Sequence, residues 1–129
     1  SRDVSMIPFM PQFRTIRRIA GDKTFEGTDG QRYADSVGSF GDFRKDKLGK
    51  HYQMPFSAQY NSAFPNLVTA GRIISATDEG WEVSRVIPVC AMTGQAAGVA
   101  ASMTLDGNIQ DVDIRGLQGR LADSGVLFL

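Results

Sequence analysis

The chain falls into two halves with different patterns of apolar and polar positions, and the change comes near Pro65. In the first half, polar and apolar side chains alternate over residues 12–19, which predicts a strand, and residues 21–22 predict a turn into a return strand. Glycine and charged residues dominate residues 38–50, which predicts a solvated loop, and residues 52–54 can form a short extended segment. We expect no long helix in this half.

The second half has a more regular pattern. Residues 66–70 form a short apolar run that is typical of a buried strand, and residues 75–84 are polar enough for a crossover at the surface. Ser84 is a suitable N-cap for a helix that starts near Val86. Asp113 is a suitable cap for a last helix, and the final apolar residues can form an edge strand. The apolar face of that last helix would carry Ile114, Leu117 and Leu121.

The longest uncharged run extends from Val86 to Leu105 and consists largely of small side chains. Gly94 and Gly98 lie four residues apart within it, which fits a buried helix or a helix whose backbone lies close to another group. Pro88 falls in the expected first turn, where a missing N–H costs little, and Gly107 is a suitable left-handed cap after the end. The run also has the length of a membrane span, but its mild hydropathy, its proline and the lack of flanking aromatic belts favour a helix outside a membrane.

Charge and cysteine content narrow the class of protein. Fourteen basic residues balance fourteen acidic ones, so the charge favours neither nucleic acid nor a membrane surface as a partner. With one cysteine, Cys90, and one histidine, His51, the chain supports neither an internal disulfide framework nor a metal site. No secretory signal is visible, which favours a soluble, cytoplasmic protein. The chain does not begin with Met, however, so we interpret it as a piece of a longer protein whose compartment stays open.

The sequence does not encode a complete nucleotide-binding domain. A strand that feeds a helix is the geometry at which nucleotide cofactors bind, but the expected strands are too few for an independently stable parallel sheet. No G-x-G-x-x-G or Walker motif is present. Both observations favour a fragment.

The stretch AGRIISATDEGWEVSRVIPVCAMTGQAAGVAA, residues 70–101, closely resembles the C-terminal flavin-contacting signature of the FAD-dependent oxidoreductase family. In that family a strand ends in Ala-Gly-Arg, a Ser-Ala-Thr loop follows, and an Arg-Val-x-Pro helix start leads into Gly-Gln-Ala-Ala-Gly-x-Ala-Ala. These elements stand here at residues 70–72, 75–77, 85–88 and 94–101. The resemblance extends to an Arg-rich strand at residues 14–22 and a closing helix at residues 111–125.

The resemblance implies an α+β fragment of a two-domain flavoenzyme. Residues 1–65 would belong to a β-rich substrate or cap domain, and residues 66–129 would form the C-terminal part of an α/β FAD-binding domain. The glycine-rich pyrophosphate turn would come from a missing N-terminal region of the same protein. FAD is therefore the cofactor expected for the full-length parent, and we expect the isolated fragment not to retain it.

The resemblance also implies which residues contact the flavin. The helix that starts near Val86 would direct its free N–H groups at the N1–C2 edge of the reduced flavin, where negative charge develops. The cofactor-binding residues expected on this basis are Ala70, Gly71, Arg72, Arg85, Val86, Ile87, Gly94 and Gln95.

Arg85 and Asp78 are the candidate catalytic residues. Asp78 stands where the commoner family pattern has a histidine, and a carboxylate there could act as a base. Arg14 and Arg17 could bind the carboxylate of a small-molecule substrate, and Trp81 could stack on a ring of substrate or flavin. Purely structural roles stay open: an ion pair for Arg85 or Arg72, and a cover over the core edge for Trp81.

Two other functions stay open. The chain could be a non-enzymatic packing or interaction module that uses the GxxxG helix as an interface to another chain. It could also belong to a polysaccharide-acting protein with a flavin-like fold, although no matched acid–base pair is evident.

Overall fold

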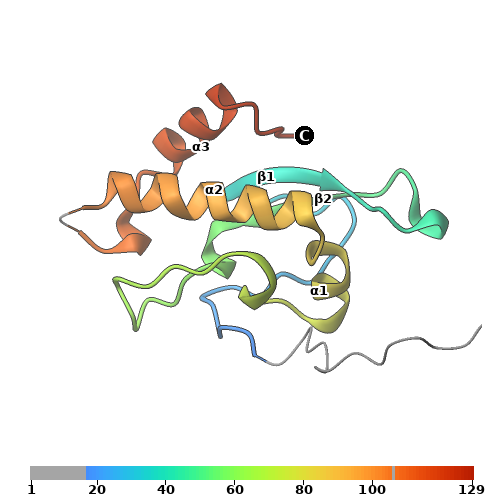
Figure 1. Ribbon diagram of the computed structural model, residues 1–129, viewed down its shortest axis with the longest axis horizontal. Coiled ribbons are helices and arrows are strands. Elements are labelled where there is room, and N and C mark those ends of the chain that lie inside the picture. Colours follow the sequence, from blue (N-terminus) through green and yellow to red (C-terminus); the bar gives the residue numbers. More distant parts are fainter. Residues whose placement is uncertain (1–16, 106) are drawn as a thin grey trace, which may run out of the picture.

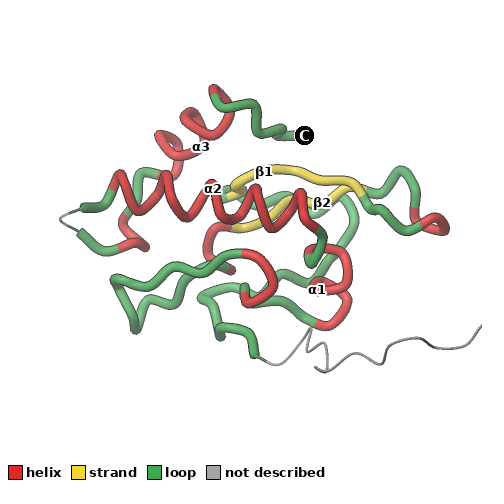
Figure 2. Tube along the Cα trace, in the orientation of Figure 1, coloured by secondary structure: helices red, strands yellow, loops and turns green. Residues whose placement is uncertain are grey.

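A computed structural model describes residues 17–105 and 107–129 as a small α+β fold. Two strands, β1 (Ser36–Gly41) and β2 (His51–Pro55), form one antiparallel sheet, and three α-helices follow: α1 (Asp78–Ser84), α2 (Ile87–Met103) and α3 (Ile114–Asp123). Long loops join these elements (Figure 2). Four short 3-10 turns lie within them, at Lys45–Lys47, Phe56–Ala58, Gly71–Ile73 and Ile109–Asp111. The expected strand at residues 12–19 lies largely outside the described residues, and so does Arg14.

The hairpin of β1 and β2 is partly a correction of the sequence-based expectation. Residues 52–54 are extended, as predicted, but the start of the predicted loop at residues 38–50 belongs to β1. β1 pairs through Gly41 with His51, and its register shifts between Ser36 and Ser39. Gly38, at φ +148°, permits the close approach of Met92, because a Cβ there would come within 2.4 Å of the Met92 sulfur. Packing against α2 therefore selects a strand where the local sequence favours a loop.

One hydrophobic core takes side chains from both halves of the chain. Both α2 and α3 pack against β1, and α2 also contacts α3 (Figure 1). Among the largest fully buried side chains are Phe25, Tyr52, Met54, Phe56, Ile74, Leu117 and Leu121. The proposed division near residue 65 stays a prediction.

The region before α2 differs from the expectation in two ways. Residues 66–70 are not a strand: Leu67 is exposed, and only Val68 forms an isolated bridge, with Tyr60. The expected crossover at residues 75–84 contains α1, whose N-cap Thr77 accepts a hydrogen bond at its hydroxyl from the N–H of Gly80. A helix this short, with a glycine in it, carries too little periodic signal to be recognised from the sequence.

The ends of α2 also shift relative to the prediction. Ser84 closes α1, and the N-cap of α2 is Val86. Pro88 occupies the first turn, as expected. The helix ends at Met103 with Thr104 as its C-cap, so Gly107 is not the cap.

The last helix confirms the pattern read from the sequence. Asp113 caps α3 by accepting a hydrogen bond from the N–H of Arg115 (3.1 Å), and Leu117 and Leu121 are fully buried. The terminal residues do not form a strand, although the N–H of Ser39 in β1 donates to the carbonyl of Leu127 (2.7 Å).

We expect Asp113→Ala to lower the free energy of unfolding by about 1 kcal/mol, because the first turn of α3 loses its side-chain acceptor. Urea titration followed by circular dichroism measures the change. Asp123→Ala, at the other end of the same helix, is the matched control and should be neutral or slightly stabilising, since a carboxylate is unfavourable at a helix C-terminus. Equal losses in the two variants would contradict the capping role.

Candidate functional site

The corner between α1 and α2 brings together most of the residues predicted to contact flavin. Only Arg85 and Val86 separate the two helices, whose axes differ by 94°. Val86 is extended and caps α2 through its backbone, and no side chain of the described residues caps this end. Ile87 is 83% exposed. Pro88 has no N–H, and the Cys90 N–H donates to the Val86 carbonyl. The first turn of α2 therefore leaves the N–H groups of Ile87 and Val89 without a helical acceptor.

Arg85 and Trp81 form a stacked pair at this corner. The guanidinium of Arg85 lies 5.3 Å from the centre of the Trp81 ring and donates two hydrogen bonds to Glu82, at 3.1 and 3.2 Å. Trp81 is 5% exposed, and its indole N–H donates to the carbonyl of Arg72 (3.2 Å). In this arrangement Trp81 closes the core edge, while Arg85 keeps part of its charged group at the surface.

Asp78 lies at the start of α1, where Arg18 binds it. The Arg18 guanidinium donates to Asp78 (2.8 Å) and to the carbonyl of Thr77 (3.1 Å). The Asp78 side chain is 96% exposed, so its negative charge is solvated as well as paired. A surface hollow of about 340 Å³ adjoins it, lined by Arg18, Asp78, Trp81 and Glu82. Arg17, the neighbour of Arg18 in the chain, is exposed. The sequence places Arg18 in the same basic run but gives no signal for the contact of Arg18 with α1.

The Ala70–Arg72 segment is fixed to α2 by its backbone. Gly71 has φ +69°, which favours glycine, and its N–H donates to the Thr93 hydroxyl (3.0 Å). A Cβ on Gly71 would lie 3.6 Å from the Cys90 sulfur, so the turn passes close to the first turns of α2. Arg72 extends from this turn into solvent. The structure thus brings residues 70–72 next to the first turns of α2.

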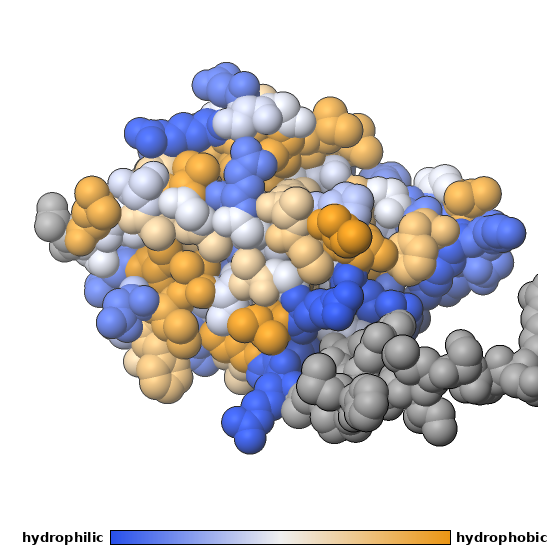
Figure 3. Space-filling view, in the orientation of Figure 1, coloured by the Kyte–Doolittle hydropathy of each residue, from blue (hydrophilic) through white to orange (hydrophobic). Residues whose placement is uncertain are grey.

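Gly94 and Gln95 lie on a face of α2 that the described chain leaves uncovered. A Cβ built at Gly94 or Gly98 would meet no atom within 4 Å. The small-residue face of α2 consists of the exposed residues Ile87, Ala91, Gly94, Gln95, Gly98 and Ala101, and Figure 3 shows a mostly pale to orange surface over this helix. The opposite face is buried through Val89, Thr93, Ala96 and Ala100. The glycines therefore face outward, and any group that approaches them closely comes from outside the described residues.

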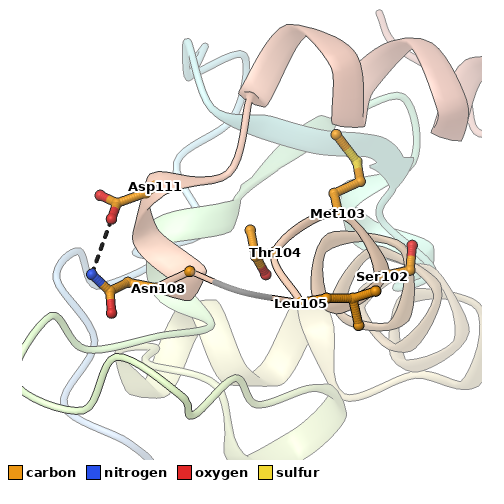
Figure 4. Close-up of a pocket in the computed structure, with 7 residues that line it drawn as sticks. Ser102, Met103, Thr104, Leu105, Asn108 and Asp111 are labelled. Carbon is orange, nitrogen blue, oxygen red and sulfur yellow. Dashed lines mark hydrogen bonds between the residues drawn. The ribbon is translucent and has the colours of Figure 1, made fainter.

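The far end of α2 carries a different hollow, of about 420 Å³ (Figure 4). Its lining includes Asn108, whose amide donates to Asp111 (3.0 Å), and the exposed Leu105. It contains none of the residues predicted from the signature, so we do not place the candidate site there.

The sequence gave no signal for a buried ionic network beside α1. The carboxylate of Asp42 has no exposed surface and accepts hydrogen bonds from Arg44 (2.7 Å) and from the Tyr52 hydroxyl (2.7 Å). The Arg44 hydrogen bonds hold the pKa of Asp42 well below its usual range. Burial, together with the Asp42 charge, raises the pKa of Tyr52 to about 12. The same guanidinium reaches Glu79 in the first turn of α1 (3.0 Å), across 35 residues of sequence.

The match to a known family includes the signature at residues 70–101 and extends over most of the chain. Residues 4–121 match the family model described as FAD dependent oxidoreductase, so the chain belongs to the FAD-dependent oxidoreductase family. The family implies FAD as the cofactor of the parent protein. No curated protein and no solved structure matches the chain significantly. Within the described ranges no single helix is long and apolar enough to cross a membrane, and the bent pair α1–α2 meets that test by length and composition only.

Proposed function

We propose that this chain completes the flavin site of an FAD-dependent oxidoreductase and supplies part of its substrate site. The observation that carries the proposal is the start of α2, which leaves the N–H groups of Ile87 and Val89 without a helical acceptor and lies next to the turn at Gly71. A partial positive charge at this end stabilises an anionic group placed against it. The small-residue face of α2 continues from the same end, so a ring and a neighbouring chain segment can approach the backbone closely.

The residues present fit a flavin, because a helix N-terminus, a glycine turn and the small-residue face of α2 adjoin one another. Bound FAD would supply the chemistry by accepting and releasing an electron pair, as flavins do in general. Val86 and Ile87 would contact the N1–C2 edge through the backbone, and Ala70, Gly71 and Arg72 would also contact the cofactor. The pyrophosphate turn would come from a region of the parent outside these 129 residues, which also makes that region the main partner of this chain.

Two charged residues at the α1–α2 corner are proposed to serve the substrate. Arg85 keeps part of its guanidinium exposed next to the start of α2 and can orient an anionic group there. Asp78 lines the surface hollow that Arg18, Trp81 and Glu82 also line. Its carboxylate can accept a proton from a substrate once the ion pair with Arg18 is broken. Arg14 and Arg17 are proposed to assist in binding the small-molecule substrate. Trp81 would hold the guanidinium of Arg85 in place through the contact with its ring.

The absorption spectrum of the full-length parent tests this function. A yellow protein with flavin bands that bleach on reduction supports the proposal. A well-folded parent that stays colourless after incubation with FAD contradicts it, and leaves the interaction module as the better account. In a parent that binds no flavin, the uncovered face of α2 would be the surface that such a module offers to another chain.

We expect Gly94→Leu to abolish or strongly weaken FAD retention by the parent, because a large side chain on the small-residue face of α2 blocks close approach to the backbone. Absorbance of the purified protein at the flavin bands measures retention. The matched control is Gly119→Leu on the exposed surface of α3, where a Cβ likewise meets no atom within 4 Å. Equal retention in the two variants would contradict close approach at Gly94.

A further inference from the structure

Asp42 fixes the position of one guanidinium near the end of β1. Its buried carboxylate accepts hydrogen bonds from the N–H, the Nε and an Nη of Arg44, at 3.0, 3.0 and 2.7 Å. The Tyr52 hydroxyl from β2 donates a further hydrogen bond to this carboxylate. Arg44 is itself largely buried, with 20% of its side chain exposed. A bidentate pair of this kind leaves the guanidinium a single orientation.

Arg44 also donates a hydrogen bond to α1. The Nη that binds Asp42 also donates to Glu79 (3.0 Å), and Lys47 approaches the same Glu79 oxygen at 3.4 Å. Lys47 has no contact with Asp42 among the interactions of the described residues. Glu79 thus has two cationic partners, of which only Arg44 connects it to the buried carboxylate.

A small displacement of Glu79 would also move the residues of the candidate site, because they follow it closely in the chain. It occupies the first turn of α1, two residues before Trp81, and α1 passes through Arg85 and Val86 directly into α2. On its other side α1 rests on Phe25, because Gly80 packs directly against the Phe25 carbonyl. The tie from Arg44 therefore holds the helix from a second direction.

We propose that Arg44 is a positioning residue for the start of α2: Asp42 fixes its guanidinium, which holds Glu79 and with it the short helix that carries Trp81 and Arg85. The part of this inference that concerns flavin rests on the proposed function. Arg44 acts through α1 and has no contact with the cofactor. Loss of the tie would let α1 tilt, and the N–H groups at the start of α2 would move with it.

The first test uses Trp81, the only tryptophan of the 129-residue chain, as a reporter of α1. Fluorescence emission is compared for the unchanged chain, Arg44→Met, Glu79→Ala and Lys47→Met. The Glu79 variant removes the half-exposed acceptor of Arg44 on α1 and keeps the buried Asp42–Arg44 pair. The Lys47 variant removes the same unit of positive charge from beside Glu79 without breaking the tie, and is the matched control.

We expect the Trp81 emission to shift to longer wavelength, with easier quenching by acrylamide, in Arg44→Met and Glu79→Ala but not in Lys47→Met. Unchanged emission in Glu79→Ala overturns the inference, because Arg44 would then serve only the buried pair. Equal shifts in Glu79→Ala and Lys47→Met also overturn it, since the charge balance around Glu79 rather than the tie would be responsible.

The second test measures the flavin reduction potential in the parent with FAD bound, well below the unfolding temperature of each variant. We expect the potential to fall in Arg44→Met and Glu79→Ala, because the reduced, anionic flavin loses stabilisation from the displaced helix end, and to stay constant in Lys47→Met. Lowered thermal stability with an unchanged potential would mean a merely structural role and overturn the inference. A parent that binds no FAD overturns the proposed function instead, and the Trp81 emission then still decides whether Arg44 positions α1.

Discussion

Gly80→Ala is expected to destabilise the fold by about 3 kcal/mol, the upper range for forcing a methyl group into a packed interior. A Cβ at this position would lie 2.1 Å from the carbonyl oxygen of Phe25 and 3.0 Å from its carbonyl carbon. These are backbone atoms of a residue that is 1% exposed, so no flexible side chain can move away. Chemical denaturation of the purified chain, followed by circular dichroism, measures the change in the free energy of unfolding.

Gly98→Ala provides the control for this substitution. It makes the same change in a helix, but at a site where a Cβ meets no atom within 4 Å. We expect it to stabilise the isolated chain by about 0.5–1 kcal/mol, because alanine loses less backbone entropy than glycine in a helix. A Gly80 variant as stable as the Gly98 variant would contradict the close packing of α1 against Phe25.

Asp42→Asn is expected to lower the free energy of unfolding by about 2–3 kcal/mol at neutral pH, the range for losing a charge-assisted hydrogen bond while its partners stay buried. Arg44 would keep its positive charge but lose its buried counter-ion, and the Tyr52 hydroxyl would lose a charged acceptor. Asp46→Asn, on an exposed residue of the same loop, is the matched control and should change stability little.

The effect of Asp42 should depend on pH in a defined direction. Its pKa in the folded chain lies well below that of an unfolded aspartate, which is about 3.9. The carboxylate therefore contributes its full stability above that unfolded value, and the contribution is lost as the pH falls toward the folded pKa. Unfolding free energies measured from neutral to strongly acidic pH should converge for the unchanged chain and Asp42→Asn. A constant difference over that range would contradict an ionised, hydrogen-bonded Asp42.

The features that the sequence predicted correctly are continuous in the chain. The signature at residues 70–101 led to the family, and that assignment is confirmed by the family match. The helix after Val86 could be recognised because its apolar and small residues extend over several turns, and α3 because Asp113 precedes a periodic apolar face. Each of these features depends on neighbours within a few positions.

The features that the sequence did not predict depend on contacts between distant residues. β1 is a strand although glycines interrupt it, because Met92 of α2 packs against Gly38. The tie between Arg44 and Glu79 had no sequence signal, since 35 residues separate two charged side chains that look like ordinary solvated groups. The roles of the individual site residues stay predictions.

By itself, the sequence determined the family, the two long helices and the capping of α3, because local hydrogen bonding and helical periodicity leave a readable pattern. Only the tertiary structure decided that α1 is a helix, that the small-residue face of α2 points outward, and that Arg44 connects the hairpin to the candidate site. The physical reason is that packing and ion pairing depend on which segments meet in space, and chain-distant contacts leave no periodic pattern in a single sequence.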